Sequence, residues 1–173
     1  MTLGPFGLAQ IVLLLVCGQR LGELAWSRRN ERRLCALGAV ESAAGQHRWF
    51  VALHAGWLAA MALAVDSATA VDFRWLAVYV ALQGVRGWVL YRLGIYWTTR
   101  VLSLPAAPLV TRGPYRFLSH PNYVLVAWEL VVLPLAFGLW PLALLASLAN
   151  LPLTWLRISA EERALAPRRP MPR

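Results

Sequence analysis

The chain alternates between apolar runs and short segments rich in arginine, and this alternation limits the folds open to it. A helix needs roughly 20 residues to cross the hydrocarbon core of a bilayer, and backbone groups inside that core must be satisfied within the helix. Five apolar runs suit such helices, at about 5–26, 49–65, 73–93, 121–135 and 139–156. We therefore expect an all-α, polytopic membrane protein with about five transmembrane helices in one domain covering residues 1–173.

Composition supports this expectation and excludes an ordinary soluble domain. Hydrophobic residues make up 59% of the chain and charged residues only 14%, and the mean hydropathy is +0.53. All 17 basic residues are arginine and the net charge is +9, which could suggest a nucleic-acid partner. The arginines lie between the apolar runs, as the positive-inside rule describes, so we expect membrane lipids and no nucleic acid as partners.

The distribution of charge also predicts an orientation. Residues 27–48 carry five arginines: Arg28, Arg29, Arg32, Arg33 and Arg48. This segment is expected to be a cytoplasmic loop with a short interfacial helix at 30–37. The acidic connection 66–72 suits the outer side, and the N-terminus is expected outside. Residues 95–119 are expected to form an irregular cytoplasmic connector, and the tail 157–173 a basic interfacial helix that ends at Pro167.

The sequence GPYRFLSHPNY at residues 113–123 is the run in which polar chemistry is most concentrated. Pro114 and Pro121 disfavour helix at the residue before them, and proline is tolerated in the first helical turn. His120, Asn122 and Tyr123 therefore stand where a helix begins. Free backbone N–H groups and the helix dipole favour an anionic ligand there. The motif predicts a cofactor site.

A second polar motif, RISAEERAL at residues 157–165, follows the last apolar run. Arg157 and Glu161 are four residues apart and share one helix face, while Glu162 and Leu165 are expected on the neighbouring face. An arginine–glutamate pair opposite a histidine and a tyrosine suits a zwitterionic cofactor rich in hydroxyl groups. We expect this cytoplasmic C-terminal segment to bind the cofactor together with the first motif. The expected cofactor-binding residues are Tyr115, His120, Asn122, Tyr123, Arg157, Glu161 and Glu162.

Three polar side chains lie within expected membrane helices. Gln83 and Arg86 are three residues apart and share a face, and Glu129 is six residues beyond Tyr123. Polar groups at such depth are costly and often functional; the alternative for Arg86 is that it extends to the interface. Glu129 needs a partner, for which the candidates are Arg157, Arg86 or the cofactor, and a structural ion pair is the plainer reading.

The remaining histidines and the cysteines predict no further chemistry. His54 lies alone on an apolar face and is expected to be a core histidine bonded to a neighbour. His47 is expected in a loop or at the interface. Cys17 and Cys35 lack the spacing of a metal site, so we expect neither a metal nor a disulfide.

Together these motifs resemble the isoprenylcysteine carboxyl methyltransferase family, membrane enzymes that use S-adenosylmethionine. The family pattern is Gly-Pro-Tyr, then Arg-His-Pro-x-Tyr, a glutamate in the following hairpin, and Arg-Ile-x-x-Glu-Glu-x-x-Leu. It corresponds here to Gly113, Pro114, Tyr115, His120, Pro121, Tyr123, Glu129, Arg157, Ile158, Glu161, Glu162 and Leu165. Two positions depart from the pattern. Ser119 replaces an arginine that would support binding of a substrate carboxylate, and Leu125 replaces a glycine, which narrows the cofactor channel.

Three further segments resemble a small bacterial subgroup of that family. They read RLGELAWSRRNERRLCALGAVE, HRWFVALHAGW and LGIYWTTRVLSLP. Some members of the subgroup are encoded with type III polyketide synthases and methylate a hydroxyl of long-chain alkylpyrones or phenolic lipids. The resemblance implies an enzyme of the bacterial inner membrane whose active site faces the cytoplasm, with a functional link to such a synthase.

The expected function is methyl transfer from S-adenosylmethionine to a hydroxyl or carboxyl oxygen of a lipophilic acceptor, such as an alkylpyrone, a phenolic lipid or an isoprenylcysteine. The reaction chiefly requires alignment of the two reactants and exclusion of water. Glu129, Arg157 and Arg86 are the expected catalytic residues, and Gln83, Arg86 and Trp97 are expected to bind the acceptor. The alternative is a non-enzymatic scaffold or anionic-lipid-binding subunit. A transporter is less supported because the chain has no inverted repeat.

Overall fold

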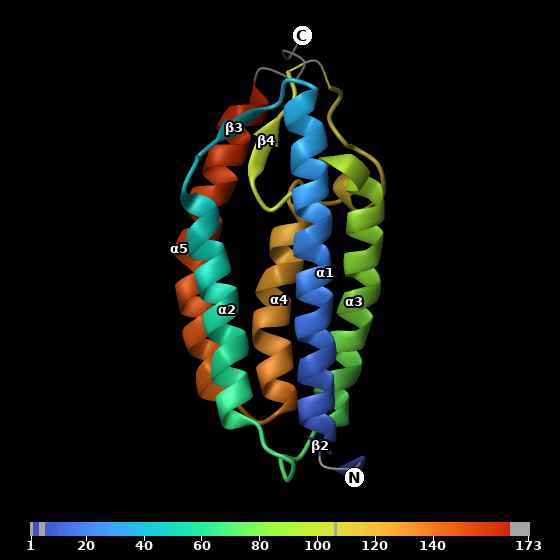
Figure 1. Ribbon diagram of the computed structural model, residues 1–173, viewed down its shortest axis with the longest axis vertical. Coiled ribbons are helices and arrows are strands. Elements are labelled where there is room, and N and C mark those ends of the chain that lie inside the picture. Colours follow the sequence, from blue (N-terminus) through green and yellow to red (C-terminus); the bar gives the residue numbers. More distant parts are fainter. Residues whose placement is uncertain (1, 4–5, 106, 167–173) are drawn as a thin grey trace.

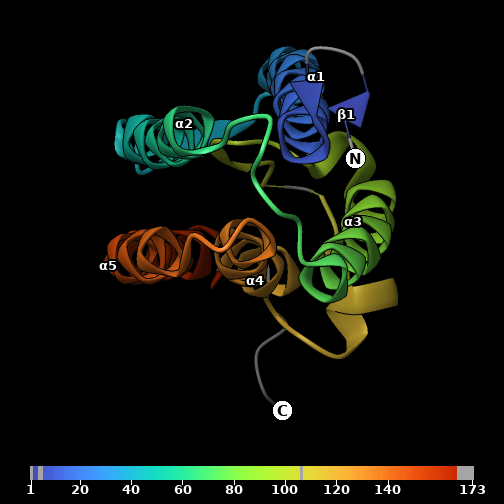
Figure 2. The same ribbon diagram turned by 90° about the horizontal axis from the view of Figure 1, so that it is seen from below.

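Five long helices make up most of the computed structural model, which describes residues 2–3, 6–105 and 107–166. They are α1 (Leu8–Ala36), α2 (Gln46–Ala64), α3 (Phe73–Leu93), α4 (Pro121–Ala136) and α5 (Trp140–Leu165). The helices run along the long axis of the molecule (Figure 1). Seen along that axis, α4 lies between α3 and α5, with α1 and α2 across from them (Figure 2). The prediction of an all-α fold is confirmed.

Short strands and 3-10 turns complete the fold at the two ends of the bundle. At one end β1 (Thr2–Leu3) pairs with β2 (Phe6–Gly7). At the other, called the upper end because it lies at the top of Figure 1, β3 (Val40–Ser42) pairs antiparallel with β4 (Val101–Ser103). The 3-10 turns are η1 (Gly94–Tyr96) and η2 (Gly113–Arg116). Part of the connector expected at 95–119 is therefore regular structure.

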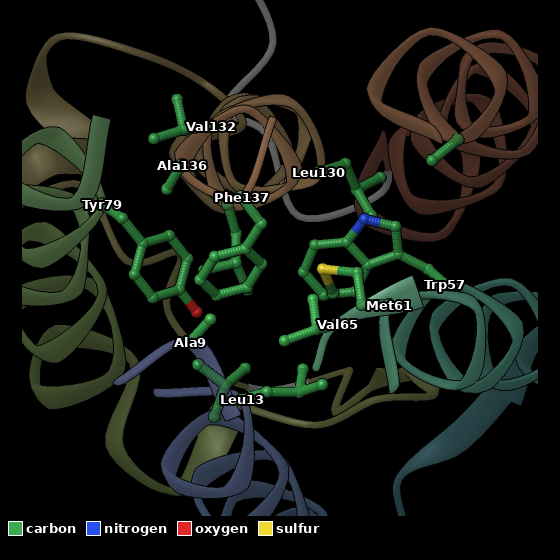
Figure 3. Close-up of a cluster of buried hydrophobic side chains, with 13 residues drawn as sticks. Ala9, Leu13, Trp57, Met61, Val65, Tyr79, Leu130, Val132, Ala136 and Phe137 are labelled. Atoms are coloured by element: carbon green, nitrogen blue, oxygen red, sulfur yellow. The ribbon is translucent and has the colours of Figure 1, made fainter. Parts of the chain in front are cut away.

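The apolar core lies between α1, α2, α3 and α4 (Figure 3). Each helix contributes residues at a spacing of three or four, which places them on one face. Examples are Leu13 of α1, Trp57 and Met61 of α2, and Leu130 and Leu133 of α4, all at most 5% exposed. This core holds the four helices in register, and so fixes the point at which α4 begins.

Much of the apolar surface faces outward. Among the described residues, α1 and α5 are the two helices long and apolar enough to cross a membrane by length and composition, and only 17% and 22% of their most apolar windows are buried. Large side chains such as Leu15, Leu63 and Leu145 are 70%, 91% and 64% exposed. Contact of such residues with water is unfavourable, so this surface suits lipid. The fold is that of a membrane protein, while the number of spans stays a prediction.

The main correction to the sequence-based expectation concerns α1. A loop at 27–48 with a separate short helix at 30–37 was wrong, because α1 continues as one helix of 29 residues to Ala36. Its last turns bury Ser27, Asn30 and Leu34 to 0%, 1% and 2% exposure, on one stripe. The arginines between them are exposed and lower the mean hydropathy of this segment, so a hydropathy profile does not detect the buried stripe. Residue 5, where the first span is expected to begin, and the tail from 167 onward lie outside the described residues.

The close approach of Gly7 to the loop between α2 and α3 gives a first prediction. A Cβ at position 7 would lie 2.5 Å from the backbone oxygen of Ser67, so Gly7→Ala must displace backbone. We expect a loss of about 1–3 kcal/mol in unfolding free energy, measured by thermal unfolding in detergent. The matched control is Gly22→Ala within α1, where a Cβ meets nothing within 4 Å. Equal unfolding midpoints for the two variants would contradict the prediction.

Candidate active site

The two polar motifs meet at the upper end of the bundle. The helix α4 begins at Pro121, whose missing N–H is not needed in the first turn, and His120 is its N-cap residue. Its first turn faces the last turns of α5. There the Arg157 Nε donates to the Tyr123 hydroxyl at 3.2 Å, and that hydroxyl donates to Glu161 Oε2 at 2.5 Å. Residues 34 and 38 positions apart are thus joined in one hydrogen-bonded chain.

His120 extends this arrangement to the second glutamate. Its Nε2 donates to Glu162 Oε1 at 3.0 Å, and its Nδ1 lies 3.7 Å from Glu161 Oε2. The guanidinium of Arg157 is also stacked over the ring of Phe50 in α2, 5.2 Å from its centroid. Arg157 is buried, whereas the side chains of Glu161 and Glu162 are 31% and 40% exposed. The two carboxylates are therefore held in place and still accessible to a ligand.

A cavity opens beside this cluster. Its lining includes residues predicted to bind the cofactor: Tyr115, His120, Asn122, Tyr123, Arg157 and Glu161. Other lining residues come from the connector after α3 and include Tyr96, Trp97 and Arg100. Burial and the carboxylate of Glu161 raise the pKa of the Tyr115 hydroxyl, which stays protonated. Glu162 contacts His120, which itself lines the cavity.

The residues around the cavity fit a zwitterionic nucleoside cofactor. Asn122 Oδ1 is buried and has no hydrogen-bond partner among the described residues, so it can accept a bond from a ligand. Arg157 can bind a carboxylate, and Glu161 can accept bonds from an amine or from ribose hydroxyls. Several aromatic rings line the cavity and can contact a cationic centre. This donor set matches S-adenosylmethionine in charge and in hydrogen-bonding groups.

A second polar cluster lies deeper in the bundle and is called the charge cluster. Its charged members are Arg20 and Glu23 of α1, Arg86 of α3 and Glu129 of α4. Arg86 donates through Nε to Glu129 Oε1 at 2.8 Å and through Nη2 to Oε2, and Arg20 Nη2 lies 2.9 Å from Glu129 Oε2. Glu23 Oε2 is 2.8 Å from Arg20 Nη1 and 3.1 Å from Arg86 Nη1. Two arginines balance two glutamates, so the cluster is formally neutral.

The amide of Gln83 also donates to Glu129 Oε1, at 2.9 Å. Gln83 and Arg86 therefore share a face, as their spacing predicts, and Arg86 is a partner of Glu129. Within the described part of the chain, Arg157 pairs with Tyr123 and not with Glu129. Arg20 is a further partner of Glu129 that was not among the expected ones. Its spacing of three from Glu23 indicates a pair between those two residues, but carries no signal for Glu129.

The two clusters are separate. Glu129 lies six positions after Tyr123 in α4, which corresponds to about 9 Å along the helix. Arg157 and Trp97 line the cavity, whereas Gln83, Arg86 and Glu129 are not among its lining residues in the described chain. The connector also supplies Tyr96 and Arg100 to the cavity, and the sequence motifs gave no reason to select them. His54 donates to the carbonyl of Phe50 at 2.8 Å, as a core histidine would.

Comparison with known proteins agrees with this geometry. Residues 75–167, more than half of the 173, match the family model of the isoprenylcysteine carboxyl methyltransferase family. The chain belongs to this family. Both polar motifs and Glu129 lie within the matched region. As its name states, the isoprenylcysteine carboxyl methyltransferase family is one of methyltransferases, and with the apolar helices this indicates a membrane methyltransferase.

A relative from Bacillus subtilis (strain 168), the uncharacterized protein YpbQ, is similar over almost the whole chain. The two are 33% identical over 159 residues, which is 90% of this chain and 94% of the relative. The similarity therefore includes α1 and α2, which precede the region matched to the isoprenylcysteine carboxyl methyltransferase family. No solved structure matches this chain.

Proposed function

We propose that this protein transfers a methyl group from S-adenosylmethionine to an oxygen of a lipophilic acceptor. The observation that carries the proposal is a cavity lined by both the hydrogen-bonded chain Arg157–Tyr123–Glu161 and aromatic side chains. When bound, the cofactor supplies an electrophilic methyl group on a cationic sulfur. The protein's part is to bind and orient the reactants and to exclude water.

The residues of the cavity have distinct parts in this proposal. Arg157 holds the cofactor carboxylate, and it is itself oriented by Tyr123 and Phe50. Glu161 accepts hydrogen bonds from the amine or the ribose hydroxyls, and Asn122 Oδ1 accepts one more. Trp97 also lines the cavity, where it contacts the acceptor. Glu129, Arg86 and Gln83 support this site from a distance, because they fix α3 against α4.

A hydroxyl acceptor must lose its proton, whereas a carboxylate acceptor arrives without one. His120 is the candidate base for that proton, because it lines the cavity and its ring is held between Glu162 at Nε2 and Glu161 near Nδ1. The carboxylates of Glu161 and Glu162 would stabilise the imidazolium that forms. We therefore favour a phenolic or enolic hydroxyl, such as that of an alkylpyrone, over the carboxyl of an isoprenylcysteine.

The arginines at the upper end support a cytoplasmic orientation of this site. Arg28, Arg29, Arg32 and Arg33 are exposed on the last turns of α1, beyond its apolar part. By the positive-inside rule, such arginines favour the cytoplasmic side for the upper end and for the cavity within it. In this proposal the protein lies in a bacterial inner membrane, and a type III polyketide synthase produces the acceptor.

The decisive experiment is transfer of labelled methyl from S-adenosylmethionine by the detergent-purified protein. A long-chain alkylpyrone with a free hydroxyl and a farnesylated cysteine derivative are offered in parallel. The same pyrone with its hydroxyl already methylated is the matched control. We expect label on the free pyrone and none on the control. Label on the cysteine derivative alone would change the acceptor class, and failure to bind the cofactor would favour the lipid-binding scaffold.

A further inference from the structure

The last turns of α1 hold the segment that forms one wall of the cavity. Asn30 is 1% exposed, and its Nδ2 donates to the carbonyl oxygens of Gly94 and Trp97 at 3.0 and 2.8 Å. One side-chain amide therefore binds both Gly94, the first residue of η1, and Trp97, the residue that follows the end of η1. Gly94 ends α3 with φ 53° and ψ −119°, a conformation that favours glycine. The chain changes direction at Gly94, and the two hydrogen bonds from Asn30 hold the backbone in this turn.

Ser27 and Glu31 hold the next part of the same segment. The Ser27 hydroxyl, fully buried, accepts a hydrogen bond from the Thr99 N–H at 2.8 Å, and the two hydroxyl oxygens lie 3.0 Å apart. Glu31 Oε1 accepts from both hydroxyls, at 2.9 and 3.2 Å. Its other oxygen lies 3.6 Å from Arg100 Nε. Ser27, Asn30 and Glu31 thus bind the connector at four positions, which are Gly94, Trp97, Thr99 and Arg100.

The connector segment held by α1 lines the cavity, although no residue of α1 is among the lining residues in the described chain. Tyr96, Trp97, Thr98 and Arg100 line the cavity, whereas Thr99 directs its side chain to α1. The segment's own backbone supplies one short turn and the three-residue ladder to β3. Ser103 Oγ donates to the Ala164 carbonyl of α5 at 3.3 Å, and His47 Nδ1 of α2 lies 3.2 Å from the Thr99 carbonyl. The contacts from α1 add to these and hold residues 94 to 100, a part of the connector that lines the cavity.

We propose that Ser27, Asn30 and Glu31 form a clamp that positions the connector wall for cofactor binding. They are positioning residues for the proposed methyl transfer, and this inference rests on that proposed function. All three precede residue 75, so they lie outside the region matched by the family model. The first helix thereby becomes part of the active site, although it supplies no residue to the cavity lining that the structure describes.

The test compares Asn30→Ala, Thr99→Val and Thr99→Ser. Thr99→Val keeps the side-chain shape and removes the hydroxyl, whereas Thr99→Ser keeps the hydroxyl. The first readout is hydrogen exchange of residues 94–103 without any ligand, which we expect to rise in Asn30→Ala and Thr99→Val only. The second is the KM for S-adenosylmethionine, expected to rise about tenfold for Asn30→Ala and about threefold for Thr99→Val, with kcat nearly unchanged.

Ser147→Ala in α5 is the matched control, because its hydroxyl bonds only to Ala143 of the same helix. It should change neither readout. Unchanged exchange in both clamp variants would overturn the proposal whatever the ligand. Faster exchange with an unchanged KM would also overturn it, since the wall would then not control binding. If the wild-type protein binds no S-adenosylmethionine, the proposed function fails and the cofactor role of the clamp fails with it, while the exchange data still report whether the clamp holds the connector.

Discussion

Replacing Glu129 by leucine, with Arg86 left in place, is expected to abolish most of the folded protein. Glu129 is 2% exposed and accepts hydrogen bonds from Arg86, Arg20 and Gln83. Without it, two arginines face one glutamate inside the bundle. Breaking a buried ion pair in this way costs about 3–5 kcal/mol, a large share of a typical stability of about 5–15 kcal/mol. The yield of monodisperse protein and the thermal midpoint in detergent measure the effect.

The double variant Glu129→Leu with Arg86→Met is the control that isolates charge. It removes one charge of each sign and leaves Arg20 paired with Glu23 at 2.8 Å. Apolar residues of similar volume often replace a buried pair at little cost, so the double variant should recover most of the lost stability. A single variant as stable as the wild type would refute the coupling. Methyl transfer by the purified double variant then shows whether Glu129 and Arg86 are also needed for the methyl-transfer reaction.

Glu161→Ala is expected to weaken S-adenosylmethionine binding by roughly 100-fold, with little change in stability. Glu161 lines the cavity, is partly exposed, and ends the chain from Arg157 through Tyr123. Its removal deletes a charge-assisted hydrogen bond to the ligand and leaves the Tyr123 hydroxyl without its acceptor. Losses of about 1.5–3 kcal/mol for each such bond give this range. Calorimetric titration of the purified protein measures the dissociation constant.

The matched control is Arg163→Ala, which removes an exposed charge two residues after Glu161 in the same helix. It should leave the dissociation constant within about twofold of the wild-type value. His120→Ala should lower affinity less than Glu161→Ala, because its imidazole contacts the two glutamates from the side. An unchanged affinity in Glu161→Ala, with the protein still folded, would show that the cofactor binds elsewhere.

The helices were predictable where apolar residues dominate and proline or glycine ends the run. The starts of α3 and α4, at Phe73 and Pro121, agree with the expected ranges. The extension of α1 was not predictable from hydropathy, because its arginines outnumber its buried residues. The stripe of Ser27, Asn30 and Leu34 at spacings of three and four is a weaker signal, and its meaning depends on a connector about 65 residues away in sequence.

The site was predictable to the extent that its chemistry is local. His120, Asn122 and Tyr123 are consecutive or nearly so, and Arg157 and Glu161 share a helix face, so the motifs alone bring them to two facing surfaces. Which arginine pairs with Glu129 is a question of packing between helices. The sequence left Arg157, Arg86 and the cofactor as candidate partners, and the packing of α1, α3 and α4 selects Arg86 and adds Arg20.

The charge cluster also imposes an order on biosynthesis. Arg20 and Glu23 leave the ribosome together and form a neutral pair within one turn of helix. Arg86 follows, and until α4 is made the growing chain holds two arginines against one glutamate in this region. Glu129 arrives 43 residues after Arg86 on α4, the shortest of the five helices in the described chain, and supplies the missing negative charge. A nascent chain that stops before α4 therefore lacks both the core residues of that helix and the carboxylate that balances the charge cluster.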